Sequence, residues 1–141
     1  MSGLGEFITS QRWFRSRTRV RTETTIVDAV PIANLVVLLV RMRFVGGPDE
    51  TYVTSFSGEQ EAPASLAEHL IASMRRGGCA YRGVHGSLIV SPGLHALADL
   101  VPGVLSRAEQ TNTSVRFGAQ AILKLYRSVS VGPNPEVEIL R

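Results

Sequence analysis

Three segments in the first half of the chain show the apolar or alternating patterns of β-strands. Residues 24–30 are rich in β-branched side chains, residues 35–45 are mostly apolar, and residues 50–56 alternate in polarity. The last two segments are joined by Gly46-Gly47-Pro48-Asp49, a sequence typical of a hairpin turn. The pattern therefore predicts an antiparallel meander.

Helical periodicity appears on both sides of this meander. Residues 4–11 carry apolar side chains at i, i+3 and i+4, and residues 64–76 carry a longer apolar stripe. Ser65 is a candidate N-cap for the second helix, and Gly77-Gly78 would end it. With a further short strand at residues 86–91, the pattern predicts an α+β fold: a curved antiparallel sheet with flanking helices segregated on one side.

After about Pro102 the strands become shorter. Residues 104–109, 115–117 and 121–126 read as strands, with a polar turn at 110–114 and a tight turn at 118–120. A Gly-Pro-Asn-Pro loop then leads into a helix predicted at residues 136–141. We place a soft domain boundary near Leu100, which separates residues 1–100 from residues 101–141.

The composition excludes several classes of protein. Hydrophobic residues make up 44% of the 141, and the formal net charge of +3 is mild, so the chain is globular and not disordered. A single cysteine, Cys79, excludes an internal disulfide, and the three histidines lie too far apart for a local zinc site. The longest apolar stretch, residues 32–40, is far short of the roughly 20 that span a bilayer. With no basic-then-apolar signal pattern at the start, we expect a cytoplasmic protein with no membrane partner.

Five arginines lie within residues 12–21, and the last four of them would share one face if this segment is extended. Beside Trp13 and Phe14, such a run can bind nucleic acid or an acidic partner. The rest of the chain has no second basic patch. A solvated strand face whose aromatic residues anchor the core therefore explains the run better than nucleic-acid binding.

Candidate chemistry lies in a polar turn, a lysine-bearing strand and a helix that carries acids. Such a turn offers hydroxyl and backbone N–H groups to phosphate oxygens, while a lysine that pairs with a helical carboxylate can reach nucleotide phosphates. Of the 15 lysines and arginines, one is a lysine, Lys124, and keeping this compact cation here indicates a chemical need. The alternative is a solvated strand lysine, a plain turn, and acids that merely favour a helix N-terminus.

These segments resemble the maltokinase family, kinases that phosphorylate maltose with ATP and are sometimes fused to trehalose synthase. Residues 109–115 are similar to the family's EQSNTSV, with Thr111 in place of serine, residues 122–127 resemble ILKLFR, and residues 132–139 resemble GxNPxxEI. Gln11-Arg12-Trp13-Phe14 matches the QRWF that opens the family's N-terminal cap. The resemblance covers the whole chain in order. A related glucosamine kinase group shares the layout, which leaves the sugar open.

The resemblance implies a nucleotide site when its residues are carried over by position. The phosphate-facing loop would be Thr111, Asn112, Thr113 and Ser114; Lys124 would contact the ATP phosphates; and Glu138, rather than Glu136, would be the helix partner of that lysine. It also implies ATP and Mg as cofactors of the complete kinase. One departure is plain: where the family reads GGKGR after QRWF, this chain has Arg15-Ser16-Arg17-Thr18-Arg19, so the local turn must differ.

We therefore expect the N-terminal cap and the start of the N-lobe of an ATP-dependent sugar kinase, acting on maltose or a related sugar such as glucosamine. By itself this piece is expected to be inactive, with no catalytic residue and no cofactor of its own. Its partner would be the rest of the kinase, the C-lobe, or a trehalose synthase. The alternative is a freestanding, non-catalytic interaction module that docks on a kinase or a trehalose-pathway enzyme. A third hypothesis is a weak nucleic-acid binder that uses the arginines.

Overall fold

The computed structural model describes residues 3–94, 101–106 and 111–132, in which antiparallel strands predominate and confirm the α+β prediction. The elements in chain order are α1 (Leu4–Ser10), β1 (Arg21–Ile32), β2 (Leu35–Phe44), β3 (Glu50–Ser57), β4 (Gln60–Glu61), α2 (Pro63–Arg75), β5 (Cys79–Arg82), β6 (Ser87–Val90), β7 (Val104–Ser106), β8 (Asn112–Phe117), β9 (Ala121–Tyr126) and β10 (Ser128–Val129).

The large sheet has the strand order β1-β2-β3-β10, and β4 pairs with β3 as well. The predicted meander of β1, β2 and β3 is confirmed, with each of the first two strands paired to the next. Gly46 and Gly47 adopt positive φ angles of 65° and 72° in the β2–β3 hairpin, a conformation that glycine adopts at little cost. Two smaller antiparallel sheets complete the fold: β5 with β6, and β7-β8-β9.

Strand β2 is apolar over most of its length because both of its faces are covered. Leu38, Val40 and Met42 pack with the α1 residues Leu4 and Ile8 in one core cluster. The alternate residues Leu35 and Val37 pack with Leu66 of α2 in a second cluster. Since successive side chains of a strand point to opposite faces, the two helices cover opposite faces of β2. The prediction that the helices share one side of the sheet is therefore wrong.

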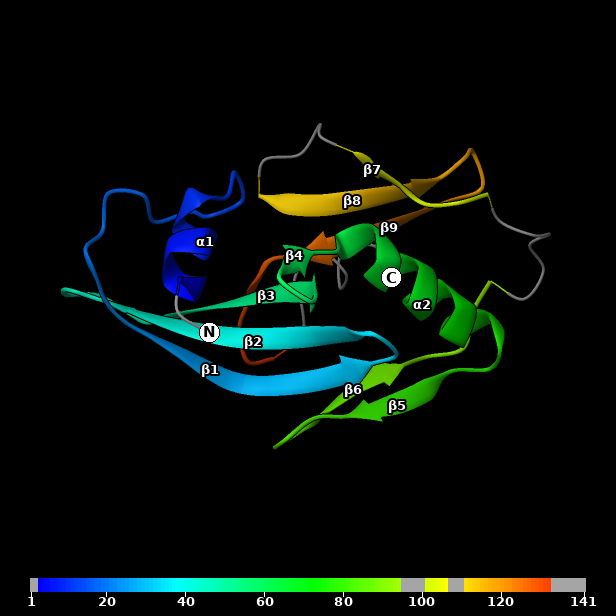
Figure 1. The fold of residues 1–141 in the computed structure, drawn as a ribbon, viewed down its shortest axis with the longest axis horizontal. Coiled ribbons are helices and arrows are strands. Elements are labelled where there is room, and N and C mark those ends of the chain that lie inside the picture. Colours follow the sequence, from blue (N-terminus) through cyan, green and yellow to red (C-terminus); the bar gives the residue numbers. More distant parts are fainter. Residues whose placement is uncertain (1–2, 95–100, 107–110, 133–141) are drawn as a thin grey trace.

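Helix α2 connects the large sheet to the β7-β8-β9 sheet. In Figure 1 it lies between that sheet and the β5–β6 hairpin, while α1 lies over the opposite end of the large sheet. On one side, Ala67 and Ile71 of α2 pack against Val115 and Phe117 of β8 in a third core cluster. The helix thus fixes the face of β8 that points toward the large sheet.

The segment at residues 12–21 is not the extended strand that its alternating arginines suggested. It forms turns and irregular backbone up to Val20, and β1 begins at Arg21. Trp13 and Phe14 are consecutive and both buried, at 6% and 4% exposure. A flat strand would send them to opposite faces, so their shared burial requires irregular backbone.

Several other boundaries differ from the prediction. Helix α2 begins at Pro63 with Ala62 as its N-cap, so Ser65 lies inside the first turn and does not cap it. Proline at the first helical position sets the φ angle and lacks the N–H that would otherwise be unpaired there. Strand β5, in which Cys79 lies, was missed, as were β4 and β10, because short strands of mixed polarity carry little periodic signal.

The expected polar turn at residues 110–114 is shorter than predicted. Strand β8 already begins at Asn112, because residues 112–114 pair with residues 124–126 of β9. The tight turn at residues 118–120 is confirmed, with φ 57° at Gly118. The end of the strand predicted at 104–109 and the helix predicted at 136–141 lie outside the described residues.

Candidate functional site

The β7-β8-β9 sheet carries the lysine on one of its two faces. Cross-strand pairing places Ser114 of β8 opposite Lys124 of β9 and, across its other edge, opposite Ser106 of β7. Side chains directly opposite in an antiparallel pair lie on the same face, with Cβ atoms about 4.5–5.5 Å apart. Asn112 and Tyr126 form the next pair on that face. The register thus brings together three of the predicted residues: Asn112, Ser114 and Lys124.

Lys124 lies between a polar and an apolar part of this face. Its Nζ atom is 5.9 Å from the centroid of the Tyr126 ring, within the range of a cation–π contact. On its other side, Val104 and Ile122 are both paired with Arg116, so all three side chains share this face. Val104 is 66% and Ile122 is 56% exposed. Lys124, beside hydroxyl and amide groups, therefore lies next to a row of two exposed aliphatic side chains with Arg116 between them.

The remaining predicted residues are placed differently. Thr113 points to the opposite face, the one that packs toward α2, and its hydroxyl accepts a 2.8 Å hydrogen bond from Nε of Arg127. Thr111 is exposed and precedes β8. Glu138 and Glu136 lie outside the described residues. The nucleotide-binding roles of this set, and the pairing of Lys124 with Glu138, stay predictions.

Arg127 is a buried residue that sequence reasoning missed. Its side chain is 1% exposed, and its Nη1 atom donates to the carboxylate of Glu61 and to the carbonyl oxygen of Val53 at 3.2 Å. Its guanidinium carbon lies 4.6 Å from the centroid of the Trp13 ring, a cation–π contact. Burial lowers the pKa of the guanidinium, and the Glu61 carboxylate opposes that shift by favouring the charged form. The Glu61 carboxylate also accepts a 3.1 Å hydrogen bond from Thr54.

A cavity of about 190 Å³ opens beside this ion pair. It is lined from one side by residues of the first half of the chain and from the other by Ser106 of β7 and by Asn112 and Thr113 of the predicted phosphate loop. The QRWF motif contributes Gln11, Arg12 and Trp13 to the lining. The N-terminal motif and the predicted nucleotide loop, which are about a hundred residues apart in sequence, therefore meet at one place.

The arginines of residues 12–21 make specific intramolecular contacts. Arg19 donates to the Glu50 carboxylate at 3.3 Å and to two carbonyl oxygens of the β2–β3 hairpin, and its guanidinium lies over the Phe44 ring. Arg21 pairs with Glu6 at 2.7 Å. Arg17 donates to the carbonyl oxygen of Gln11. These contacts favour a structural role for the segment, although it is not the strand face that the pattern suggested.

Glu50 is the acceptor at the centre of this region. Besides Arg19, its carboxylate accepts hydrogen bonds from Ser16 and from the hydroxyl of Tyr52, the latter at 2.6 Å. Burial raises the pKa of the fully buried Tyr52 phenol, and the hydrogen bond to the carboxylate raises it further. Ser16, which stands at a glycine position of the family pattern, and Arg19, at a cation position, thus tie the turn to β3.

Asp28 holds the tip of the β5–β6 hairpin against β1. Its two carboxylate oxygens accept backbone N–H bonds from Val84, His85 and Gly86, at 2.7, 3.2 and 2.8 Å. These bonds, that of Gly86 foremost, favour the ionised form and lower the pKa of Asp28 below its ordinary value. Asp28 is therefore a structural anchor of the hairpin.

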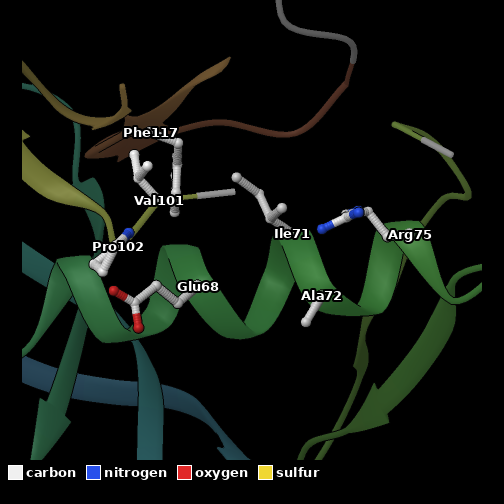
Figure 2. A pocket seen from close by; sticks show the side chains of 7 residues that line it. All are labelled: Glu68, Ile71, Ala72, Arg75, Val101, Pro102 and Phe117. Atoms are coloured by element: carbon white, nitrogen blue, oxygen red, sulfur yellow. The ribbon is translucent and has the colours of Figure 1, made fainter. Parts of the chain in front are cut away.

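A second hollow, of about 420 Å³, lies beside α2. Figure 2 shows its lining, with Ile71, Ala72 and Arg75 on the helix and Val101, Pro102 and Phe117 across from them. Glu68 closes one end, where its carboxylate accepts the backbone N–H of Gly103 at 3.1 Å. The lining is mostly apolar and offers few polar groups to orient a ligand.

Within residues 3–94, 101–106 and 111–132, no three histidine, cysteine or acidic side chains gather in a group that could hold a metal ion. The helices seen there are too short or too polar to cross a bilayer.

The fold and the site define a class of protein: an α+β domain with a curved antiparallel sheet, joined to a small sheet in which a lysine lies beside polar side chains. Residues 7–85 match the family model described as the maltokinase N-terminal cap domain. The chain belongs to this family, which confirms the resemblance read from its motifs. We refer to residues 7–85 as the cap. The division of the chain near Leu100 stays a prediction, and β10 from beyond that point completes the large sheet of the cap.

Proposed function

We propose that this chain forms the N-terminal, nucleotide-facing part of an ATP-dependent sugar kinase of the maltokinase type. The observation that carries the proposal is the register of β8 and β9, which sets Lys124 beside Ser114 on the face turned away from α2. The cap family match supports the kinase context. Maltose, or a related sugar such as glucosamine, would be the phosphate acceptor, and the remaining catalytic groups would come from a C-terminal lobe.

The face of the β7-β8-β9 sheet suits the two halves of a nucleotide. A flat, weakly polar base needs aliphatic surface, and Val104 and Ile122 present it uncovered, at 66% and 56% exposure. Phosphate oxygens need a cation and hydrogen-bond donors, and Lys124 lies beside the hydroxyl of Ser114 and the amide of Asn112. The two aliphatic side chains, with Arg116 between them, adjoin the polar groups on one face.

Bound ATP would supply the phosphoryl group and, with Mg, the charge neutralisation that its transfer requires. The contribution of the chain would be to bind and orient. The Lys124 ammonium would attract the phosphates, Ser114 and Asn112 would donate hydrogen bonds, and the two aliphatic side chains would exclude water from the base. Because the described residues show no cluster of metal-binding side chains, we assign no Mg ligand to them.

The proposal is tested by replacing Lys124 with alanine in the complete kinase. We expect kcat/KM for ATP to fall at least 100-fold, about 2.7 kcal/mol of transition-state stabilisation, with the circular dichroism spectrum unchanged. Lys124→Arg should not restore activity, because a planar guanidinium does not replace a compact ammonium. Arg43→Ala, at a cation that is 54% exposed on β2, is the matched control and should retain activity. Near-normal turnover of Lys124→Ala would refute the site assignment.

Calorimetric titration of this chain with ATP tests the same proposal through binding instead of activity. We expect weak ATP binding or none, because the face described above covers only one side of a nucleotide. Tight binding would contradict the proposed division of labour between two lobes. Should the chain instead capture a kinase or a trehalose-pathway enzyme through Val104 and Ile122, with Lys124 dispensable, the freestanding docking module would replace the proposal.

A further inference from the structure

Arg127 lies where the chain passes from the lysine strand into the large sheet. Strand β9 ends at Tyr126, and β10 pairs with β3 from Ser128 onward. Arg127 is thus the link between the sheet that carries Lys124 and the sheet of the cap. The main chain fixes this link as well, since the Val53 N–H donates to the carbonyl oxygen of Arg127 at 2.8 Å.

The side chain of Arg127 contacts both the β7-β8-β9 sheet and the large sheet of the cap. Toward the site, its Nε atom donates to Thr113, the residue next to Ser114 on β8. Toward the cap, its Nη1 atom donates to Glu61 of β4 and to the carbonyl oxygen of Val53 on β3. The face of the guanidinium lies on the Trp13 ring of the QRWF motif. One rigid, planar group therefore meets β8, β3, β4 and the N-terminal segment together.

A buried ion pair of this kind contributes more to geometry than to stability. The cost of removing both charges from water offsets much of their attraction, while the fixed directions of the guanidinium N–H groups allow few arrangements of the partners. Lys124 of β9 lies three residues before Arg127, and Ser114 adjoins Thr113 on β8. Any shift of the hairpin relative to the cap therefore moves both residues of the proposed site. A displacement of about 1 Å can reduce catalysis about 100-fold.

We infer that Arg127 is a positioning residue through which the cap fixes the place of Lys124 and Ser114. It touches neither nucleotide nor sugar. The inference rests on the proposed function for its catalytic consequence, whereas its structural part, the orientation of the β8–β9 hairpin on the cap, is independent of that function.

Two variants test the inference without removing the buried charge. Thr113→Val, which is nearly isosteric, removes the acceptor of Nε and leaves the Glu61 pair in place. Arg127→Lys keeps a positive charge but loses the planar guanidinium, whose N–H groups donate in fixed directions. Met42→Val, in the core cluster under α1, is the control that perturbs the core without removing a contact of Arg127.

The first measurement is the residual dipolar couplings of backbone amides in this chain. In the wild type and in Met42→Val, one alignment tensor should fit the amides of β1–β3 and of β8–β9 together. In Thr113→Val and Arg127→Lys, the β8–β9 amides should need a tensor of their own. The second is steady-state kinetics of the complete kinase. There both variants should lower kcat/KM for ATP about 10-fold and leave the KM of the sugar unchanged.

A single tensor in both variants, with unchanged kcat/KM for ATP, would overturn the inference. So would equal kinetic losses in Met42→Val, since the effect would then be one of stability in general. Failure of the proposed function is recognised separately, by an active Lys124→Ala kinase. In that case the tensor measurement still decides whether Arg127 fixes the hairpin on the cap.

Discussion

Replacing Glu61 with glutamine removes the carboxylate that pairs with Arg127. The guanidinium of Arg127 is 1% exposed, and it would stay buried without a counter-charge. Removing one partner of a buried ion pair costs about 3–5 kcal/mol, because the remaining charge has lost both water and its partner. Since the Glu61 side chain keeps 16% exposure and the glutamine carbonyl still accepts a hydrogen bond, we expect the lower end, about 3 kcal/mol.

Urea unfolding followed by tryptophan fluorescence measures this loss. Trp13 is the single tryptophan of the chain and contacts Arg127, so its emission reports on the perturbed region. About 3 kcal/mol corresponds to a fall in melting temperature of roughly 10 °C for a chain of this size. The matched control is Glu23→Gln, which removes a carboxylate from the pair with Arg43, where both side chains are 54% exposed. That change should cost less than about 1 kcal/mol.

A companion variant separates the charge from the packing. Glu61→Leu combined with Arg127→Met replaces both ions by apolar groups and should be much less destabilising than Glu61→Gln, because no charge is left buried. An unfolding free energy of Glu61→Gln within about 1 kcal/mol of the wild type would refute this reasoning. It would mean that water reaches the guanidinium.

Two further predictions concern backbone contacts of the hairpins. Because the pKa of Asp28 is lowered below 3.8, its hold on β5–β6 should be fully present above that pH and lost as the pH falls through its native pKa. The NMR chemical shifts of the Val84 and Gly86 amides should follow that transition as the pH is lowered, and the Asp28→Asn variant should lack it. A titration midpoint above pH 3.8 would contradict the assignment. Gly78→Ala should destabilise the chain more than Gly77→Ala. Both positions have positive φ, but a methyl group at Gly78 would lie 2.4 Å from the Val90 carbonyl oxygen, whereas Gly77 has open space; equal melting temperatures would contradict this.

The three long strands of the large sheet could be predicted because their residues follow the apolar or alternating patterns typical of β-strands. Both hydrophobic runs and the Gly-Gly turn specify β2, β3 and their hairpin locally, and the structure confirms them. The arginines of residues 12–21 alternate as well, but the extended strand that this pattern predicted is absent. The consecutive burial of Trp13 and Phe14 and the carbonyl acceptors of Arg19 are tertiary effects that overrode it.

The candidate site also contains residues that the sequence predicted and one that it did not. Lys124 and Ser114 were found by residue type and family resemblance, and the register of β8 and β9 placed them side by side. Arg127 was missed because nothing in its sequence neighbourhood distinguishes a buried arginine from a solvated one. Its partners lie 66 positions away, at Glu61, and 14 away, at Thr113. Contacts at such separations become visible only when the chain has folded.

The pairing of β10 with β3 means that the matched family segment, residues 7–85, does not contain every strand of the large sheet. During synthesis the sheet stays incomplete until Ser128 and Val129 have emerged, 76 and 78 residues after Tyr52 and Thr51, the residues with which they pair. A version cut back to residue 85 would leave one edge of β3 partly unpaired, the kind of edge on which a second copy can add a strand. A shortened version of the protein should therefore retain β10 together with residues 7–85.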